Sequence, residues 1–443
     1  MFDQIVQEAD RLLSEGKLQD WILRAEDTQS QELFFVRDRL DMNRQANTME
    51  YALTVYVDQE GMEDGKKVRY RGQATAEIGP DDSIEEVREK VSRAAQEAGY
   101  VQNPWFPLPK NERKECKDVY QDSVIGQFQD RYEAVLAAIF EERPGKARVN
   151  SLEIFAVDRE IKLETSTGTC ANYAMNHFTF ELVTDAEGIH EPVEVFRDYT
   201  IQEADPDQVR AIVEAQLEET NGRAQAELAK AMDHVRVVIA GDEVEEFFQL
   251  YGYRASAAAV YNHISDESVG QPFAHSLLGE KKACEAISLM ADPFLDHSPY
   301  SKPVDDEGTV LSAYSILENG VVKHLASSAQ YSYYLGQENL GNCRTFRVAG
   351  GSVDLDQILK EDHLEIIKFS SFNAIPTTGD FGGEFRLGKL VVDGKVHYIS
   401  GGSLSENLFA AADRIRFSKS VKERSRSKAP TAIIIEDAQI AGI

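Results

Sequence analysis

Hydrophobic side chains in the first hundred residues are spaced in two ways, one typical of helices and one typical of strands. Residues 3–16 carry apolar side chains every three or four positions and predict a short amphipathic helix. Residues 33–36 and 52–57 are rich in β-branched and aromatic side chains and predict strands. A longer helix is predicted from Ser83, because Ser83 and Glu86 match the capping-box pattern ahead of a helical repeat.

The middle of the chain predicts further helices and antiparallel strands. The proline-rich residues 104–109 predict a boundary loop. Helical spacing recurs over 124–141 and over 205–230, and the second of these segments can join two domains, with a break at Asn221-Gly222. Alternating apolar and polar positions predict two strands, at 151–157 and 177–183.

The second half of the chain has the turn chemistry of a β-rich region. A short apolar strand is predicted at 235–240, and a helix follows from about residue 242. Asn319-Gly320 and Asp393-Gly394 lie between β-rich arms and predict tight hairpins, because both dipeptides tolerate positive φ. The basic residues 418–428 predict a surface loop, and residues 432–435 predict a last buried strand.

Size and charge narrow the classes of function. A chain of 443 residues is long enough for two or three domains. It carries 47 Lys and Arg against 76 Asp and Glu, a formal net charge of -29. This field repels nucleic acid, whose binding depends on cations that neutralise phosphates, and it disfavours anionic membrane surfaces. No window approaches the roughly 18 apolar residues of a membrane span, so neither nucleic acid nor a membrane is an expected partner.

Cysteine use and the N-terminal residues favour a cytoplasmic protein. The four cysteines are far apart and form no CxxC pair, so neither a disulfide scaffold nor a zinc ribbon is expected. They are Cys116, Cys170, Cys284 and Cys343. The first residues lack a basic region followed by an apolar run, so no signal peptide is expected.

No segment has the spacing of a zinc protease. HExxH and HExxxH, which supply two His ligands and a Glu beside the bound water, are both absent. The nearest group is His263 with Asp266 and Glu267, where positions 263 and 267 would share a helix face, but a surface ion pair explains it more simply. Further ligands could come only through tertiary contacts, from His275, Cys284 or His297.

Other catalytic signatures are equally thin. The chain has no GxSxG elbow. Cys170 ends a Ser-Thr-Gly-Thr-Cys turn and is explained more simply as a buried structural thiol than as a nucleophile. The glycine pairs at 350–351 and 401–402 lack the phosphate-loop pattern. Residues 305–308 lack the spacing of a calcium loop and predict a solvated acidic turn.

Six segments of the second half occur in an order that resembles one known family. They are 301–308 (SKPVDDEG), 316–322 (ILENGVV), 340–344 (LGNCR), 377–381 (TTGDF), 403–408 (SLSENL) and the closing strand at 428–442. This series resembles the TldD/PmbA family of peptidase-like proteins, once described as modulators of DNA gyrase. Glu406 departs from the pattern, which usually has Gly there. The likeness covers most of residues 230–443 and is weak before that.

The resemblance identifies a helix where the family's zinc-binding members carry HExxxH. Aligning Gly252 with the motif's common Gly puts Phe248 and Tyr253 at the two His positions and Gln249 at the Glu position. Phe cannot ligate zinc, Gln has no useful pKa as a base, and Tyr ligates only as a phenolate. The position of a later Cys ligand falls near 370–372, which has no thiol. The chain therefore resembles the PmbA/TldE type, which lacks the ligands, and we expect no catalytic and no metal-binding residue.

The same helix is also predicted from its packing pattern alone. Val244, Phe247, Phe248 and Tyr251 recur every three or four positions and form a core-facing stripe. No shift of the alignment within residues 240–262 supplies a His.

The resemblance implies an α+β fold, with an N-terminal α/β-sandwich-like region beside a β-rich C-terminal PmbA/TldD-type domain. The expected division is an N-terminal domain at 1–110, a central α+β region at 111–230 and a C-terminal domain at 231–443.

The resemblance also implies a function and two alternatives. The first is a non-catalytic partner of a TldD-type zinc metallopeptidase that helps to bind and process unfolded or small peptides, with zinc in the partner only. The second is a metallopeptidase active by itself through an unrecognised metal site. The third is a peptide-binding homodimer without proteolysis. By position in the family pattern, the residues expected to contact peptide or partner are Asp305, Asp306, Thr378, Gly379, Asp380 and Phe381.

Overall fold

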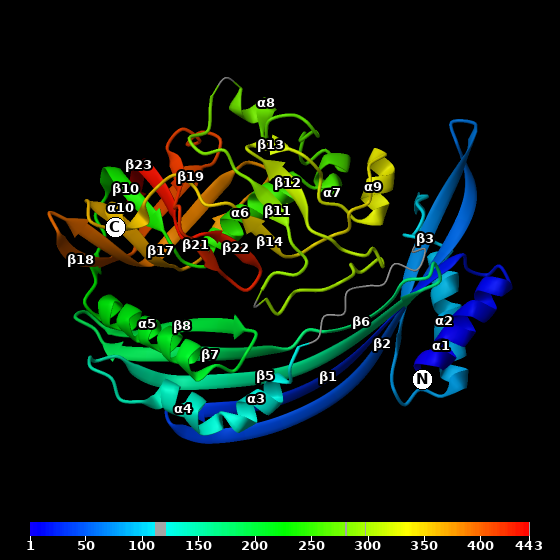
Figure 1. Cartoon of the computed structure of the whole chain (residues 1–443), viewed down its shortest axis with the longest axis horizontal. Helices are drawn as coiled ribbons and strands as arrows, with labels where there is room; N and C mark the ends of the chain where they lie inside the picture. Colours follow the sequence, from blue (N-terminus) through cyan, green and yellow to red (C-terminus); the bar gives the residue numbers. More distant parts are fainter. Residues whose placement is uncertain (111–120, 280, 297, 443) are drawn as a thin grey trace.

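The computed structural model describes residues 1–110, 121–279, 281–296 and 298–442, and its fold is α+β (Figure 1). Cys116 and His297 lie outside the described residues. A long curved sheet from the N-terminal half lies beneath a C-terminal half built on two further sheets. No helix among the described residues is long and apolar enough to cross a membrane.

The first sheet has the strand order β4-β3-β2-β1-β5-β7-β8, and β6 pairs with β5. Its strands are β1 (Asp20–Val36), β2 (Arg39–Glu63), β3 (Lys66–Ile78), β4 (Asn103–Pro104), β5 (Arg148–Thr165), β6 (Cys170–Ala174), β7 (His177–Glu187) and β8 (Pro192–Ile201). The strands predicted at 33–36 and 52–57 are segments of β1 and β2. Both strands extend far beyond them, because polar residues between about 39 and 50 pair in the ladder while exposed to solvent.

Five helices cover this sheet. They are α1 (Phe2–Ser14), α2 (Ile84–Ala98), α3 (Val124–Asp130), α4 (Tyr132–Phe140) and α5 (Pro206–Ala224). The helix predicted at 3–16 is confirmed as α1, and the capping box of Ser83 and Glu86 is formed at the start of α2. The first two helices pack on the start of β1 and the last three on its end, so each half of the sheet has its own apolar core.

Two helix predictions were wrong in detail. Residues 124–141 form two helices, because the chain turns at Arg131 (φ -108°) and lets Phe128 and Tyr132 both pack inward. Residues 205–230 form a helix only as far as Ala224, and it runs through the expected break at Gly222. An added Cβ at Gly222 would lie 2.7 Å from the ring of Tyr398, so this glycine permits close packing rather than a break.

The C-terminal half contains one nine-stranded and one six-stranded sheet. The larger consists of β9 (Glu227–Leu228), β10 (Met232–Ile239), β15 (His363–Phe369), β16 (Asn373–Ala374), β17 (Asp380–Val392), β18 (Lys395–Ser400), β19 (Gly402–Asn407), β20 (Ile415–Phe417) and β23 (Ile433–Ala441). The smaller consists of β11 (Leu289–Ala291), β12 (Tyr314–Glu318), β13 (Val321–Val322), β14 (Phe346–Val348), β21 (Val421–Glu423) and β22 (Ser427–Pro430). The helices are α6 (Glu243–Arg254), α7 (Ala257–Tyr261), α8 (His275–Leu278), α9 (Ala329–Leu335) and α10 (Leu355–Ile358).

The two hairpins predicted from turn residues are confirmed, but the surface loop predicted from the basic residues 418–428 is not. Asn319-Gly320 and Asp393-Gly394 both have positive φ at the two central residues and connect β12 to β13 and β17 to β18. The loop predicted at 418–428 was wrong, since it contains β21 and part of β22. The side chain of Arg424 donates to the carbonyls of Gly241 and Thr431, so this basic residue faces the protein.

The N-terminal sheet is continuous across the division expected at 110/111. Strands β1 to β3 precede that position and β5 to β8 follow it, yet β1 pairs with β5 along fifteen consecutive positions. Residues on both sides of the division therefore share one sheet.

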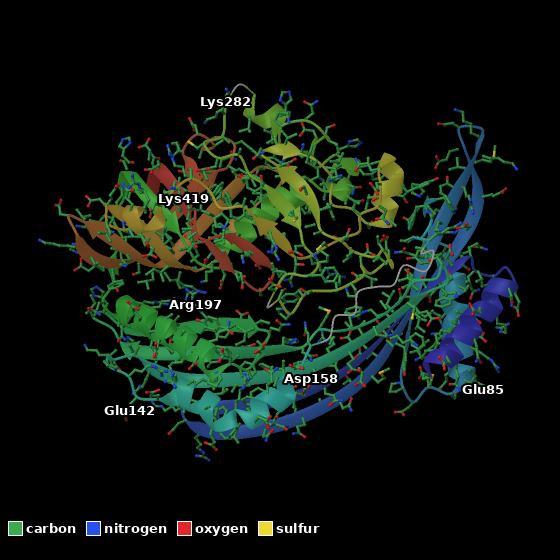
Figure 2. All side chains as sticks on the ribbon, in the orientation of Figure 1. Glu85, Glu142, Asp158, Arg197, Lys282 and Lys419 are labelled. Carbon is green, nitrogen blue, oxygen red and sulfur yellow. The ribbon has the colours of Figure 1, made fainter. Side chains whose placement is uncertain are left out.

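Arg197 and Glu219 tie this sheet to the C-terminal half. Arg197 of β8 lies where the two halves meet (Figure 2) and donates to the Glu219 carboxylate of α5 at 2.8 Å. It also donates to the carbonyl of Ile367 in β15 at 3.0 Å. Only 12% of the Arg197 side chain and 6% of the Glu219 side chain are exposed. Burial raises the pKa of Glu219 although Arg197 opposes that effect.

We expect Arg197→Met to lower the free energy of unfolding by about 3–5 kcal/mol, because Glu219 would remain buried without its partner. Arg197→Met with Glu219→Leu should recover most of that loss, since no unpaired charge remains. Urea denaturation measures both. Arg93→Met is the matched control, because Arg93 forms an exposed pair with Glu89, and its effect should stay below about 0.5 kcal/mol. Equal losses for the single and double variants would contradict this account of the pair.

Candidate functional site

Helix α6 is formed by the stripe that its sequence predicts. Val244, Phe247, Phe248 and Tyr251 are all buried and pack in a core shared by both C-terminal sheets. Acidic residues fill its first turn and Arg254 its last, which complements the helix dipole. The helix is therefore held mainly by its aromatic face.

The side chains at the three positions aligned with a zinc motif point to different sides of this helix. Phe248 is fully buried, with its ring centroid 5.0 Å from that of Phe417 in β20. Gln249 and Tyr253 are exposed on the outer face. Phe248 faces the core while Tyr253 faces solvent, so in this conformation the side chains at 248 and 253 do not converge on one ion.

The outer face of α6 borders a shallow acidic depression of about 530 Å³, which we call the α6 groove. Its lining residues are Asp242, Glu245, Glu246, Gln249, Leu250, Tyr253, Ala374 and Pro376. Burial raises the pKa of Glu245, which accepts hydrogen bonds from Ser427 Oγ and the Arg426 amide. Burial also raises the pKa of Glu246, against a hydrogen bond from the Ala374 amide. The groove contains no His or Cys, the ligands that zinc prefers.

The expected pairing of His263 with Glu267 on a helix face was wrong. Helix α7 ends at Tyr261, and His263 has a positive φ of 56° that no helix allows. Glu267 is buried and accepts from the amide of Ala274 and from Arg254 Nε. The carboxylate of Glu267 thus stabilises the loop between α7 and α8. Among the described residues, no three His, Cys, Asp or Glu side chains are placed to hold a metal ion.

The remaining candidate residues are dispersed. Cys284 is exposed and its thiol donates to the carbonyl of Asp413, while His275 is exposed on α8. Cys170 is exposed as well, which corrects its prediction as a buried thiol: it lies at the solvent-facing start of β6.

Next to the α6 groove is a pocket of about 710 Å³, here called the tyrosine pocket. Its lining residues are Arg254, Val260, Tyr261, His263, Ile264, Ser265, Asp266, Ser276, Leu277, Tyr334, Leu335 and Thr377. The rings of Tyr261 and Tyr334 lie 4.8 Å apart, and Arg254 fixes the floor by donating to the carbonyl of Pro376. Sequence reasoning missed this pocket, although the tyrosine-rich run at 331–334 was the available signal.

The expected contact residues at 305–308 form a structural turn. Asp305 is 2% exposed, and its carboxylate accepts from the amides of Glu307, Thr309 and Asn342. The turn is therefore not the solvated one predicted, and Asp305 cannot reach a peptide in this conformation. Asp306 is exposed and ion-paired with Lys302 at 2.8 Å and Arg344 at 3.0 Å.

Glu307 links this turn to the tyrosine pocket. Its carboxylate accepts from the amide of Ala329 at the start of α9, the helix that carries Tyr334. Burial, with the nearby Asp305 carboxylate, raises the pKa of Glu307 to about 7. The hydroxyl of Tyr334 in turn donates to the carbonyl of Pro104. One helix thus joins the acidic turn, the pocket and the N-terminal half.

Only part of the loop at 377–381 can meet a ligand. Thr378 and Asp380 are exposed, and Asp380 accepts from Asn407 Nδ2 at 2.7 Å. Gly379 (φ 79°) is buried, and an added Cβ would lie 2.4 Å from the Phe409 ring. Phe381 is 2% exposed and packs on Phe247 of α6. Gly379 and the side chain of Phe381 are packed in the core, so in this conformation they are not available to contact a ligand.

Comparison with known families identifies the C-terminal half. A family model for the PmbA/TldA metallopeptidase C-terminal domain matches residues 232–442, which contain α6, the tyrosine pocket and the Asp305 turn. This match places the C-terminal half of the chain, residues 232–442, in the TldD/PmbA family.

Solved structures of TldD/PmbA-like fold extend the likeness to the whole chain. A Thermotoga maritima protein described as a modulator of a DNA gyrase has a TM-score of 0.76 at 16% identity and covers 100% of both chains. TldE from Thermococcus kodakarensis has a TM-score of 0.73 at 17% identity, covering 98% of this chain and 100% of that one. A Bacteroides thetaiotaomicron protein, also described as a modulator of DNA gyrase, has a TM-score of 0.78 at 15% identity over 100% and 99%. These identities establish the fold alone.

One curated relative shares part of the sequence. An uncharacterised protein of Methanocaldococcus jannaschii is 26% identical over 167 residues, which are 35% of this chain and 40% of that protein. The chain thus spans less than half the length of this relative. In this chain positions 248, 249 and 253 of α6 face different sides of the helix, the first towards the core and the other two towards solvent.

We expect the helix geometry to decide where engineered zinc ligands can bind. Gln249→His with Tyr253→His places two imidazoles four residues apart on the outer face and should create a measurable zinc site. Phe248→His with Tyr253→His should bind no zinc and should cost about 2–5 kcal/mol of stability, because an imidazole replaces a fully buried ring. Zinc titration and thermal unfolding measure both. Zinc bound through position 248 would contradict the inward orientation of that side chain.

A second expectation concerns pH. Because the pKa of folded Glu307 lies above that of an exposed Glu, its contribution to stability is present below about pH 4.5 and is lost as pH rises through about 7. Glu307→Gln should match the wild type at about pH 4 and exceed its melting temperature at pH 8.5. Glu89→Gln, on the exposed surface of α2, is the control and should show no such crossover. If the wild type is more stable than Glu307→Gln at pH 8.5, the hydrogen bond from the Ala329 amide to the charged Glu307 carboxylate outweighs the cost of burying that charge, and the account is wrong.

Proposed function

We propose that this chain is a PmbA/TldE-like subunit that holds unfolded or small peptides without hydrolysing them, beside a TldD-type zinc metallopeptidase that carries the metal. The observation that carries this proposal is the geometry of α6. Phe248 lies in the core while Gln249 and Tyr253 face outward, so this helix supplies neither ligands nor a base.

The tyrosine pocket supports the peptide-holding part of the proposal. It combines an apolar wall (Tyr261, Ile264, Leu277) with polar groups at its floor, as pockets for organic ligands usually do. These three side chains are between 37% and 48% exposed, an unusual exposure for large apolar groups that have no partner to cover. The pocket can therefore accept an apolar side chain of a bound peptide.

A cytoplasmic location belongs to this proposal. Cys170, Cys284 and Cys343 are unpaired, and two of them are exposed, which suits a reducing compartment. Whether the partner is a TldD-type subunit or a second copy of this chain is decided by the same experiment that tests peptide holding.

The test uses a fluorescently labelled unfolded peptide, with anisotropy for binding and gel analysis for cleavage. The chain alone should bind the peptide, leave it intact, and be insensitive to a chelator. Adding a TldD-type paralogue should give chelator-sensitive cleavage that this chain accelerates. Leu277→Asp should weaken peptide binding about tenfold, because a carboxylate enters the apolar wall. Tyr100→Ala, at an 80% exposed site on the N-terminal half, is the matched control and should leave binding unchanged.

Two results would overturn the proposal. Chelator-sensitive cleavage by the chain alone would establish the metallopeptidase alternative. Peptide binding that no TldD-type subunit converts to cleavage, by a chain that sediments as a dimer, would establish the homodimer alternative.

A further inference from the structure

The C-terminal domain contains a second, mainly apolar cavity of about 600 Å³. It lies on the inner side of α6, which presents Tyr251 to it, whereas the α6 groove lies on the outer side at Gln249. Five further buried side chains form its wall: Phe273, Ile287, Leu317, Phe409 and Phe417. Neither the peptide-holding proposal nor the family likeness assigns a role to this cavity.

The size and rigidity of the wall argue against a packing defect. Protein interiors rarely leave voids larger than a water molecule, whereas pockets for small ligands measure about 300–1,000 Å³. The rings of Tyr251 and Phe273 stack at 4.8 Å, and Arg254 lies 5.1 Å from the centre of Phe409 on the far side of the wall. The cavity is thus framed by side chains that hold one another in place.

The mouth of the cavity is cationic in a strongly anionic protein. Lys281 and Lys282 both line it, although the chain as a whole has a formal net charge of -29. Lys281 is paired with Asp413 at 3.2 Å. Lys282 is exposed at the outer edge of the domain (Figure 2) and has no ion pair among the described residues. Glu285, the one acidic residue among the described lining residues, accepts from the amide of Ser352.

We propose that this cavity binds an amphipathic carboxylate, with its apolar body among the aromatic rings and its carboxylate at Lys282. The ligand class follows from the combination of an apolar wall with the ammonium group of Lys282 at its rim, since an apolar body gains by leaving water while its anion stays hydrated and paired. A free acyl acid and the C-terminal residue of an apolar peptide share this chemistry.

Isothermal titration with octanoate, octylamine and N-acetyl-Leu-Phe separates these sources and tests the charge. Octanoate should bind with saturation at one site, and octylamine of the same chain length should bind at least about tenfold more weakly. If N-acetyl-Leu-Phe competes with octanoate and binds more tightly, the cavity takes peptide ends; if it does not compete, the cavity takes free acids.

Two kinds of variant locate the ligand. Lys282→Glu should weaken octanoate binding about tenfold, while Lys419→Glu, on the same domain but outside the cavity (Figure 2), should not. Ala283→Trp, at an exposed position of the rim, should abolish binding by filling the mouth without disturbing the fold. Ala412→Leu fills the cavity from inside, with circular dichroism to verify folding.

The proposal is overturned if none of the three probes saturates, if octylamine binds as well as octanoate, or if Ala283→Trp and Ala412→Leu both bind octanoate as the wild type does. Each outcome is independent of peptide holding, because neither Lys282 nor Ala283 lines the tyrosine pocket.

Discussion

The packing of α6 against both C-terminal sheets is the constraint on which the rest of this structure depends. Phe247 and Phe248 are fully buried and meet Phe381 and Phe417, which belong to different strands of the larger sheet. Replacing any of these rings would cost the transfer energy of the ring and leave a cavity besides. The helix cannot rotate without losing several such contacts at once. Its rotation therefore fixes which side chains face solvent.

That fixed rotation explains why the two proposed binding sites lie beside α6 and not on it. The outer face borders an acidic groove in which the carboxylates of Glu245 and Glu246 are already hydrogen-bonded, and the inner face presents aromatic rings to the apolar cavity. Groups able to bind a ligand come from the segments that flank the helix: α7, α9 and the chain after β16 on one side, and residues 281–286 on the other. The proposed sites of this domain are thus formed by segments that flank a rigid aromatic frame.

Several helices and turns could be predicted from the sequence, because they depend on interactions between residues close together in the chain. The stripe of α6, the capping box at Ser83 and the two positive-φ hairpins depend on residues within a few positions of one another. The tyrosine pocket could not be predicted, since Tyr261 and Tyr334 meet only through the tertiary fold. The length of β2 was hidden for a related reason: its exposed polar residues follow no apolar period, and only pairing with β1 makes them a strand.

The acidic turn at 305–308, one of the segments that resemble the TldD/PmbA family, is architectural. The carboxylate of Asp305 accepts hydrogen bonds from three backbone amides. The carbonyl of Gly308 accepts a hydrogen bond from Thr169 Oγ1 of the N-terminal half at 2.8 Å. Gly308 has a φ of 87°, and an added Cβ would lie 2.8 Å from Thr165, so a glycine is required at this contact. A motif can therefore recur in a family because it joins two halves of the fold. Since Glu307 of the same turn caps α9, this junction also sets the position of Tyr334, and the N-terminal sheet reaches the tyrosine pocket both through this helix cap and through the hydrogen bond from Tyr334 to the carbonyl of Pro104 in β4.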